Sequence, residues 1–325
     1  MSDPNELEIP AAAQPKVGDV SYDLDMVLSS VVSLRSKIPA DAFTAPILGT
    51  ERGGNGIIID DNGLILTIGY LITEAESVWV FTGDGKAAAA HVVGYDFESG
   101  LGLVQALERL AAPAMPIGSA GDLEEGEAVV VAGYGGRSQA TKANVVAKRE
   151  FAGYWEYVLD EAILTAPPHP NWGGTALLGG DGTLRGVGSL FVQQARVGAQ
   201  PLDGNMMVPI DLLEPIIGDL LSFGRTTKPP RPWLGVYATE VEDGLVIAGL
   251  ADGGPAHEAD VQPGDIVLQV GGQGVSDLAA MFRRVWAQGE AGVEVPLTVL
   301  RDGEQLLLRV RSADRVAFLK SPRLH

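Results

Sequence analysis

Short apolar runs separated by glycine-containing turns constrain the fold of this 325-residue chain more than any other feature. Residues 64–68 follow the turn Asn62-Gly63, and residues 87–95 follow an Asp-Gly turn. Turns of this kind join neighbouring antiparallel strands. Further runs of the same type cover residues 56–60, 78–81, 129–132, 144–150, 159–166 and 183–190. The pattern predicts a mainly β protein built as an antiparallel barrel or sandwich.

The composition along the chain predicts two domains joined by a linker. Residues 209–223 carry leucine and isoleucine at spacings of three and four, which predicts an amphipathic helix that closes the first domain. The run Lys-Pro-Pro-Arg-Pro follows at 228–232, and it predicts a semi-rigid spacer because proline cannot continue a helix. The predicted parts are a flexible N-terminal tail at 1–21, a first domain at 22–223, a Pro-rich linker at 224–232, a second domain at 233–315 and a C-terminal tail at 316–325.

The second domain has the pattern of a PDZ domain. A helix is predicted at 276–287, with Ser276 or Asp277 as its cap and an apolar face that includes Leu278 and Met281. A turn at Asp243-Gly244 comes before this helix, and strands at 295–301 and 305–310 follow it. Together with the sequence Pro-Gly-Asp at 263–265, this order resembles a PDZ domain over nearly the whole segment.

Composition argues against several classes of function. The net charge of −19 repels phosphate backbones and anionic lipid surfaces, so we expect no nucleic acid and no membrane as partner. The chain has no cysteine and only four histidines, so we expect no metal site and no cofactor. The N-terminus carries acids and prolines where a secretory leader has a basic start and an apolar centre. We therefore expect a cytoplasmic location, with the periplasm as the alternative.

The most specific motif lies at residues 166–188. It reads APPHPNWGGTALL at 166–178, followed by Asp-Gly at 181–182 and LRGVG at 184–188. This segment resembles the nucleophile loop of trypsin-like serine proteases of the HtrA (Deg) type, in which the corresponding run reads Gly-Asn-Ser-Gly-Gly. Trp172 stands where that serine would be. The resemblance covers roughly residues 23–315 and implies a trypsin-like double antiparallel β-barrel followed by a PDZ domain.

The same resemblance locates the other two catalytic positions. The run ILTIGYLI at 65–72 matches the family's Ile-Leu-Thr-Asn-Asn-His-Val-Val, which places Tyr70 at the general base. The run DFESGLGLV at 96–104 matches Asp-x-x-x-Asp-Leu-Ala-Leu-Leu, which places Gly100 at the aspartate. An indole N–H only donates hydrogen bonds, and a phenol with a pKa near ~10 is a weak base at neutral pH. None of the three roles of a serine triad is filled.

Pro170 bears on the oxyanion hole. In the resembling fold the hole is made by the N–H of the nucleophile and the N–H two residues before it, and Pro170 occupies that second position. Proline has no N–H, so one of the two donors is absent. Losing one such donor costs on the order of 10²–10³ in rate. We therefore expect no catalytic residue at these positions.

Two segments keep alternative interpretations. A rebuilt hydrolase would use His169 together with side chains on segments that converge on the cleft, whereas the simpler interpretation makes His169 a solvent-facing loop residue. Trp172 either packs as a plug or anchors a ligand, and Trp155 lies upstream in an aromatic cluster that serves either strand packing or binding. The other candidate side chains are Ser99, Thr175, Ser189, Asp96 and Glu98, and the aromatic cluster also contains Tyr154 and Tyr157.

The resemblance to PDZ domains implies a peptide-binding groove. Such a domain adds an extended peptide as a strand and holds its terminal carboxylate with the N–H groups of a Φ-Gly-Φ loop. Leu234-Gly235-Val236 matches that loop. The implied partners are proteins or peptides with apolar C-termini, and a degenerate PDZ fold used only for contacts is the alternative. The candidate groove residues are Trp233, Leu234, Gly235, Val236, Leu278 and Met281.

These observations lead to one hypothesis and two alternatives. The hypothesis is a catalytically inactive HtrA-like pseudoprotease that binds peptides or proteins through its PDZ domain and acts as an adaptor, regulator or holdase in protein quality control. The first alternative is a serine-type endopeptidase with a non-standard active site. The second is a structural subunit of an oligomer. A homo-oligomer is compatible with each, although no sequence feature fixes the number of subunits.

Overall fold

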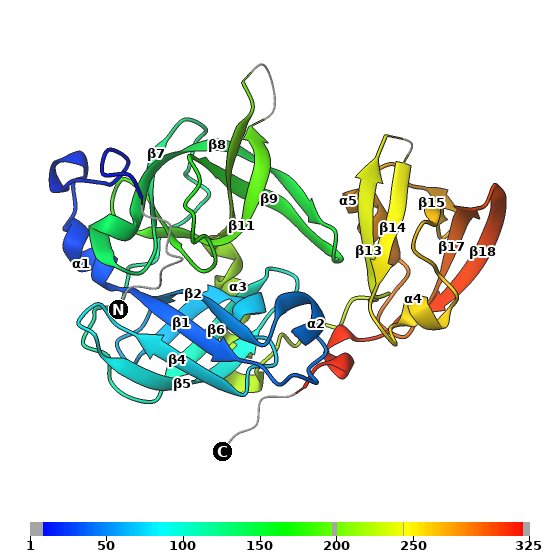
Figure 1. The fold of residues 1–325 in the computed structure, drawn as a ribbon, viewed down its shortest axis with the longest axis horizontal. Coiled ribbons are helices and arrows are strands. Elements are labelled where there is room, and N and C mark those ends of the chain that lie inside the picture. The colour runs from blue at the N-terminus through cyan, green and yellow to red at the C-terminus, as the bar shows by residue number, and fades with distance from the viewer. Residues whose placement is uncertain (1–8, 197–199, 243, 321–325) are drawn as a thin grey trace. The chain divides into compact units, whose positions relative to one another are not determined.

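The computed structural model describes residues 9–196, 200–242 and 244–320, and the chain forms two compact units (Figure 1). Unit 1 contains the described parts of Met1–Arg149, Glu161–Thr226 and Lys320–His325. Unit 2 contains Glu150–Asp160 and Thr227–Leu319. The segment 150–160, which the sequence places inside the first domain, is therefore part of the second unit.

The first half of unit 1 is a closed antiparallel barrel with the strand order β1-β2-β3-β6-β5-β4. Apolar side chains alternate or run continuously along these strands, and all five residues of β3 are buried. β3 pairs with β6 so that Ile68 faces Leu101, which brings the chain after β3 beside the chain before β6. The strands are β1 (Val31–Lys37), β2 (Glu51–Ile58), β3 (Leu64–Ile68), β4 (Ser77–Phe81), β5 (Ala87–Tyr95) and β6 (Leu101–Ala106).

The second half of unit 1 is another closed antiparallel barrel, with the strand order β10-β11-β12-β9-β8-β7. Its interior includes Val131, Ile163, Leu177 and Met207, one from each of four strands. The strands are β7 (Ala128–Ala132), β8 (Ala140–Gly153), β9 (Tyr157–Ala166), β10 (Ala176–Leu178), β11 (Leu184–Arg196) and β12 (Leu202–Pro209). The predicted double antiparallel barrel is confirmed.

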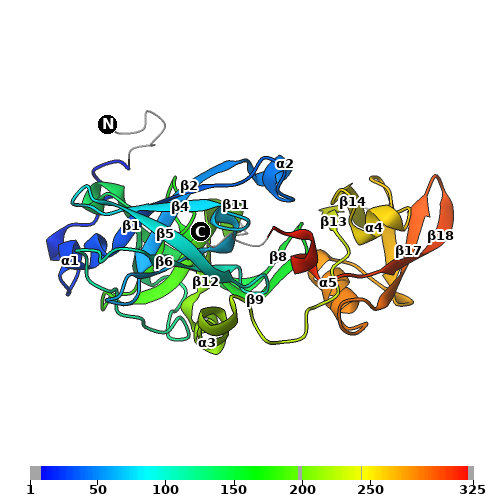
Figure 2. The same ribbon diagram turned by 90° about the horizontal axis from the view of Figure 1, so that it is seen from below.

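Short helices connect and cover the barrels. Helix α3 (Glu214–Phe223) ends at Gly224, which has a φ of 71° and donates its N–H to Leu220. The end of α3 lies against β5 (Figure 2). A Cβ on Gly94 would clash with the backbone of Gly224, so only glycine fits at 94. The other helices of unit 1 are α1 (Leu24–Ser29), α2 (Ala45–Leu48) and the 3₁₀ turns η1 (Val17–Asp19), η2 (Gly69–Leu71), η3 (Gly136–Gln139) and η4 (Ile210–Leu212).

Unit 2 is an antiparallel sheet with the order β13-β14-β15-β17-β18, and β16 pairs with β15. Its helix α5 (Leu278–Trp286) starts at Asp277, whose carboxylate accepts the N–H of Ala280, as the sequence predicts for one of its two candidate caps. The remaining elements are β13 (Val236–Val241), β14 (Gly244–Leu250), α4 (Pro255–Glu258), β15 (Ile266–Val270), β16 (Gln273–Gly274), β17 (Glu294–Arg301), β18 (Glu304–Arg311) and η5 (Arg315–Phe318).

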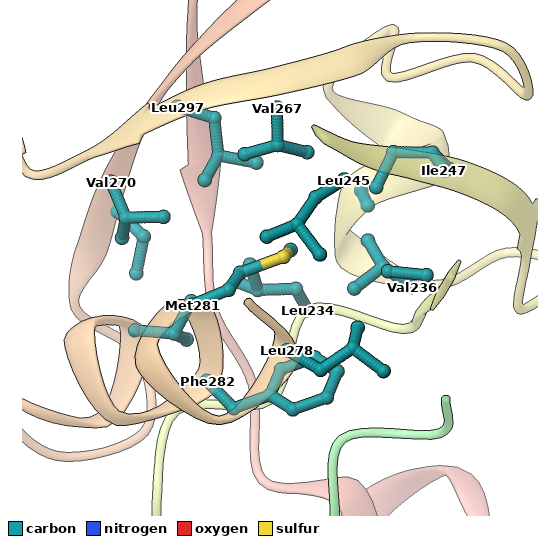
Figure 3. Close-up of a cluster of buried hydrophobic side chains, with 14 of the residues drawn as sticks. Leu234, Val236, Leu245, Ile247, Val267, Val270, Leu278, Met281, Phe282 and Leu297 are labelled. Carbon is teal, nitrogen blue, oxygen red and sulfur yellow. The ribbon is translucent and has the colours of Figure 1, made fainter. Parts of the chain in front are cut away.

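The core of unit 2 lies between α5 and the sheet. Figure 3 shows Met281 pointing from α5 into this core, toward Leu245. Met281 is fully buried, and Val158 from segment 150–160 belongs to the same cluster of buried side chains. The apolar face predicted for the helix therefore packs against the sheet.

The predicted tails and linker have more structure than their composition suggests. Ile9 is buried, and the Ala13 carbonyl accepts the N–H of Lys142, so residues 9–21 follow unit 1 closely. In the linker, the Arg231 guanidinium stacks over the Trp286 ring at 4.5 Å. Phe318 of the predicted C-terminal tail packs on Trp233. Residues 1–8 and 321–325 and Asp243 of the predicted 243–244 turn lie outside the described residues.

Among the described residues, every helix is too short or too polar to cross a membrane.

Candidate functional site

Unit 1 contains an open cleft of about 850 Å³, to which both barrels contribute. The first barrel provides residues of β1, β2 and η2, and the second barrel provides η3 and the loop before β10. Two of the three predicted catalytic segments line the cleft, the first with Tyr70 and Leu71 and the last with the run from His169 to Trp172, whereas no residue of 96–104 is among the lining residues. The fold therefore brings Tyr70, Pro170 and Trp172 to one cleft, and Gly100 lies outside its lining.

Tyr70 is fixed in place at both of its polar ends. Its hydroxyl donates a 2.9 Å hydrogen bond to the Ser189 carbonyl, and its own carbonyl accepts a 2.7 Å hydrogen bond from Arg52. A Cβ on Gly173 would lie 2.7 Å from the Tyr70 hydroxyl, so the phenol rests directly on the loop that carries Trp172. Burial raises the pKa of Tyr70 above its usual value of 10, and a side-chain hydrogen bond with Trp172 only partly opposes this rise. A neutral phenol already engaged as a donor does not serve as a general base.

Gly100 supplies backbone geometry beside this turn. It has a φ of 81°, a conformation that favours glycine, and its carbonyl accepts a 2.7 Å hydrogen bond from Gly69. Its neighbour Asp96 is buried and accepts the N–H of Ser99. The loop thus uses Asp96 to close its own turn, and Gly100 has no side chain to orient a base.

The loop before β10 offers few donors to an oxyanion. Pro170 has no N–H, and the N–H of Asn171 donates to Nδ1 of His169 at 3.1 Å. The Trp172 carbonyl accepts the N–H and the hydroxyl of Thr175 at 3.2 and 2.9 Å. The Trp172 ring lies 6.0 Å from the Phe191 ring, and the side chain is partly exposed at the cleft. Trp172 therefore both packs on a neighbour and borders the cavity.

His169 is not the solvent-facing residue that the sequence suggests. It is fully buried, its Nε2 lies 3.1 Å from the Gln139 carbonyl, and its backbone N–H donates to Oδ1 of Asn205 at 2.6 Å. Nε2 therefore carries the proton, and Nδ1 accepts from Asn171. Burial lowers the pKa of His169, so the ring is neutral. The flanking prolines suggest a surface loop, but the buried ring ties that loop to the second barrel.

The other five side chains proposed for a rebuilt hydrolase do not line the cleft. The Thr175 hydroxyl is used on Trp172, and the Ser99 hydroxyl accepts the N–H of Leu101 at 3.2 Å. Ser189, Asp96 and Glu98 are likewise absent from the lining residues. The Thr175 hydroxyl therefore donates to a backbone carbonyl and not to a base, which a serine-type nucleophile needs.

Asn55 and Arg52 hold the cleft together, and the motifs in the sequence indicated neither of them. The Asn55 amide donates to the carbonyls of Asn171 and Gly173 at 2.9 and 3.0 Å and accepts the N–H of Tyr134 at 2.8 Å. Arg52 is buried and supports the Tyr70 turn. Both residues lie on β2, and the three catalytic motifs do not include this strand.

The predicted carboxylate-binding loop of unit 2 is already occupied. Glu156 accepts hydrogen bonds from the N–H groups of Leu234, Gly235 and Val236, with shortest distances of 3.1, 2.7 and 3.0 Å. Gly235 has a φ of 76°, which lets the three N–H groups converge on one carboxylate. Burial raises the pKa of Glu156 to about 7, and the three N–H groups and Arg315 oppose the rise.

The other predicted groove residues are inside unit 2 rather than on an open groove wall. Trp233 and Leu278 are 7% and 8% exposed, and Met281 is 0% exposed because it packs into the core. The aromatic cluster lies in unit 2, where the Trp155 and Tyr157 rings stack at 5.5 Å and Tyr154 contacts Tyr237. The rings of this cluster pack on one another and on Tyr237 of β13, which agrees with the interpretation that the cluster serves strand packing.

Within the described residues, no group of three or more His, Asp or Glu side chains is arranged to hold a metal ion.

Comparison with known proteins agrees with this two-unit architecture. The model of the trypsin-like peptidase domain matches residues 54–187, and the model of the PDZ domain matches residues 232–311. The HtrA-type protease AlgW, solved with a decapeptide, has a TM-score of 0.53 and 21% identity, and the match covers 92% of this chain and 98% of that one. A serine endoprotease from Yersinia pestis has a TM-score of 0.52 and 21% identity, with 91% and 99% covered. These likenesses concern the fold.

Curated relatives are similar at low identity. A probable periplasmic DegP-like serine endoprotease of Pseudomonas fluorescens is 28% identical over 267 residues, which are 78% of this chain and 54% of the relative. DegS of Escherichia coli is 25% identical over 275 residues, covering 79% and 75%. The periplasmic pH-dependent endoprotease DegQ of Escherichia coli is 26% identical over 330 residues, covering 92% and 71%. The chain thus spans about half the length of the DegP-like relative.

Proposed function

Because the chain has the domain arrangement of the HtrA-type proteases, a trypsin-like peptidase domain followed by a PDZ domain, we propose that it is a non-catalytic member of that group which binds peptides or proteins. The observation that carries the proposal is the composition of the cleft. A buried phenol, a glycine, an indole and a proline stand at the four positions that would hold base, aspartate, nucleophile and oxyanion donor. The cleft keeps its space, but these four positions do not carry the groups with which a serine protease opens a peptide bond.

The test measures hydrolysis directly. The purified full chain is incubated with unfolded casein and, separately, with a fluorophosphonate probe that labels activated serines. We expect no cleavage above buffer and no labelling, because removing triad members of a serine protease lowers the rate about 10⁶-fold. The Trp172→Ser variant, purified in the same way, is the matched control. A contaminating protease would cleave casein equally in both preparations. Cleavage that copurifies with the chain and disappears in His169→Ala, with that variant still folded, would favour the alternative of an unconventional endopeptidase.

Peptide binding is the activity that remains for the PDZ unit. The loop at 234–236 presents converging N–H groups, which is the chemistry that holds a terminal carboxylate. We propose peptides or proteins with apolar C-termini as partners, and an adaptor, regulator or holdase role in protein quality control. Gly235→Trp fills the loop, so binding lost in this variant supports the adaptor, whereas unchanged partner capture and altered assembly support the structural subunit.

We base the proposed location on the relatives rather than on the composition. Two of the relatives are named as periplasmic, which favours the periplasm over the predicted cytoplasm for this chain as well. Fractionation of cells that express the full-length protein checks this. A homo-oligomer is the accompanying proposal, and sedimentation of the purified chain at several concentrations measures it.

A further inference from the structure

The loop that would hold a peptide carboxylate in unit 2 already holds one from the same chain. The Glu156 carboxylate is buried and satisfies the N–H groups of Leu234, Gly235 and Val236 together. The carbonyls of the loop are also engaged, since Leu234 and Gly235 accept the N–H groups of Ala256 and Ala251 at 2.8 Å each. We infer that Glu156 is a resident internal ligand of this loop and holds it closed until a peptide carboxylate displaces it.

The segment before Glu156 also takes the place of a peptide strand. β13 is at the edge of its sheet, so one side of it has no strand partner within the described sheet. The N–H of Ala238 on that strand donates a 3.0 Å hydrogen bond to the carbonyl of Tyr154. Val236 and Ala238 are two residues apart and therefore face the same edge. Their N–H groups reach Glu156 and Tyr154, which is the alternate pattern that an added peptide strand would use.

The backbone of the segment is bent to make this contact. Glu156 has a φ of 61°, a left-handed conformation that is uncommon for a residue with a side chain. Gly153 allows the bend, because a Cβ there would lie 2.7 Å from the Trp155 ring. A strained conformation persists only where surrounding contacts compensate for it. Here the compensation is the set of hydrogen bonds to the loop.

Both ends of the segment are held by unit 2. The Arg283 guanidinium on α5 pairs with Glu150 and with Asp160, the latter at 2.5 Å. Val158, two residues after Glu156, is buried in the same apolar cluster as Leu234 and Val236 of the loop, where the last side chain of an apolar-ended peptide would pack. The segment therefore matches the chemistry of the proposed ligand, a carboxylate next to an apolar side chain, and competes with it. This competition rests on the proposed peptide-binding function.

The experiment uses the full chain and measures two quantities. The first is amide hydrogen exchange at Leu234, Gly235 and Val236, compared between the wild type and Glu156→Ala. The second is the affinity for a pool of fluorescein-labelled decapeptides that end in Val, Leu, Ile or Phe with a free carboxylate, against the same pool with amidated C-termini. Glu161→Gln is the control, because it removes the same charge from an exposed side chain on β9 that pairs with Lys148.

We expect Glu156→Ala, which removes the acceptor, to lose protection at these amides and to bind the carboxylate pool at least tenfold more tightly, with no change for the amidated pool. Glu161→Gln should match the wild type in both measurements. Protection lost without any peptide binding supports the internal ligand and contradicts the proposed peptide-binding function. Unchanged protection in Glu156→Ala overturns the inference, whatever the peptides do.

A second variant separates loop occupancy from folding. Glu156→Asp keeps the charge but shortens the side chain by one methylene, so its carboxylate no longer reaches the three N–H groups together. We expect it to behave as Glu156→Ala does. Exchange at Val295 and Leu297 in β17 reports whether unit 2 remains folded, and it should stay slow in all variants. Wild-type protection of the loop in Glu156→Asp, with β17 intact, contradicts the inference.

Discussion

The cleft of unit 1 and the loop of unit 2 differ in what each offers a ligand. The cleft has about 850 Å³ of space but, at Tyr70 and Trp172, side chains that cannot attack a carbonyl. The loop keeps three converging N–H donors, but Glu156 fills it. In the proposed function, substitution removes chemistry from the cleft, whereas an internal contact limits access to the loop. A contact of that kind is reversible without a change of sequence.

The largest effect is expected for His169→Ala, which tests whether the cleft histidine is structural. The ring is fully buried and bridges Gln139 and Asn171, so its removal leaves a cavity and two polar groups without their partner. We expect the free energy of unfolding to fall by about 3 kcal/mol. Denaturant unfolding measures it, with His91→Ala at an exposed strand position as the control. Equal stability of both variants would mean that the buried ring contributes nothing to the cleft.

The next effect concerns pH and the occupied loop. Burial raises the pKa of Glu156 from 4.5 to about 7, so the docked state favours the protonated carboxyl. Protonation therefore contributes fully to the stability of the docked state below pH 4.5, and this contribution is lost as the pH rises through about 7. Arg315 on η5 opposes the rise, and Tyr237 on β13 faces the same carboxylate. A peptide carboxylate, with a pKa of about 3.5, stays ionised throughout.

Wild-type affinity for carboxylate-ended peptides should therefore increase between about pH 5 and about pH 8, by up to about 100-fold or about 3 kcal/mol. Fluorescence anisotropy at a series of pH values measures the change. Glu156→Ala supplies the reference, because it has no titrating carboxyl at this position and its profile should be flat. A wild-type profile that is equally flat would show that the state of Glu156 does not govern access.

A smaller effect is expected for Gly235→Ala, which tests the geometry of the loop. The left-handed φ costs about 1–2 kcal/mol for a residue with a Cβ, and that Cβ would lie 3.1 Å from Ala251 and 3.2 Å from Trp233. Gly264→Ala is the matched control, because Gly264 also has a positive φ but open space around it. Urea unfolding should show a greater loss for Gly235→Ala. Equal losses would mean that the loop tolerates crowding.

The smallest effect is expected for Tyr70→Phe. The change leaves the ring and removes the hydroxyl that donates to Ser189, which costs about 1 kcal/mol for a buried acceptor left without its donor. Thermal unfolding measures the loss, and Tyr154→Phe at an exposed position should change stability by less than about 0.5 kcal/mol. If peptide hydrolysis were present and disappeared in Tyr70→Phe, the phenol would have a catalytic role.

Sequence patterns predicted the strands with strong alternation and clear turns. Residues 64–68 and 87–95 match β3 and β5, because an Asn-Gly or Asp-Gly turn marks where each begins. β12 was missed, since Asp, Gly and Asn in LDGNMMVP are typical of loops. Its Asn205 is buried and accepts the N–H of His169, so a tertiary hydrogen bond compensates for the weak local preference.

The candidate site was predicted in position but not in contacts. Motif spacing located Tyr70, Pro170 and Trp172, which do line one cleft, because the family's motifs fix positions along strands and loops. Glu156 could not be found in this way. It lies 78 residues before Leu234, and an acid among aromatic residues gives no local sign that three distant N–H groups will bury it. The stability of such a contact depends on the partner surface rather than on the segment.

The segment 154–156, which hydrogen-bonds to the edge of β13, also affects the aggregation of this protein. An uncovered outer strand is a template for pairing with the same strand of another molecule, and such pairing leads to aggregates. The Tyr154 carbonyl occupies one N–H of that strand and Glu156 another, so the chain shields its own template. Displacement of Glu156 therefore exposes the edge of β13. A bound peptide would cover the same N–H groups and give the same protection against pairing.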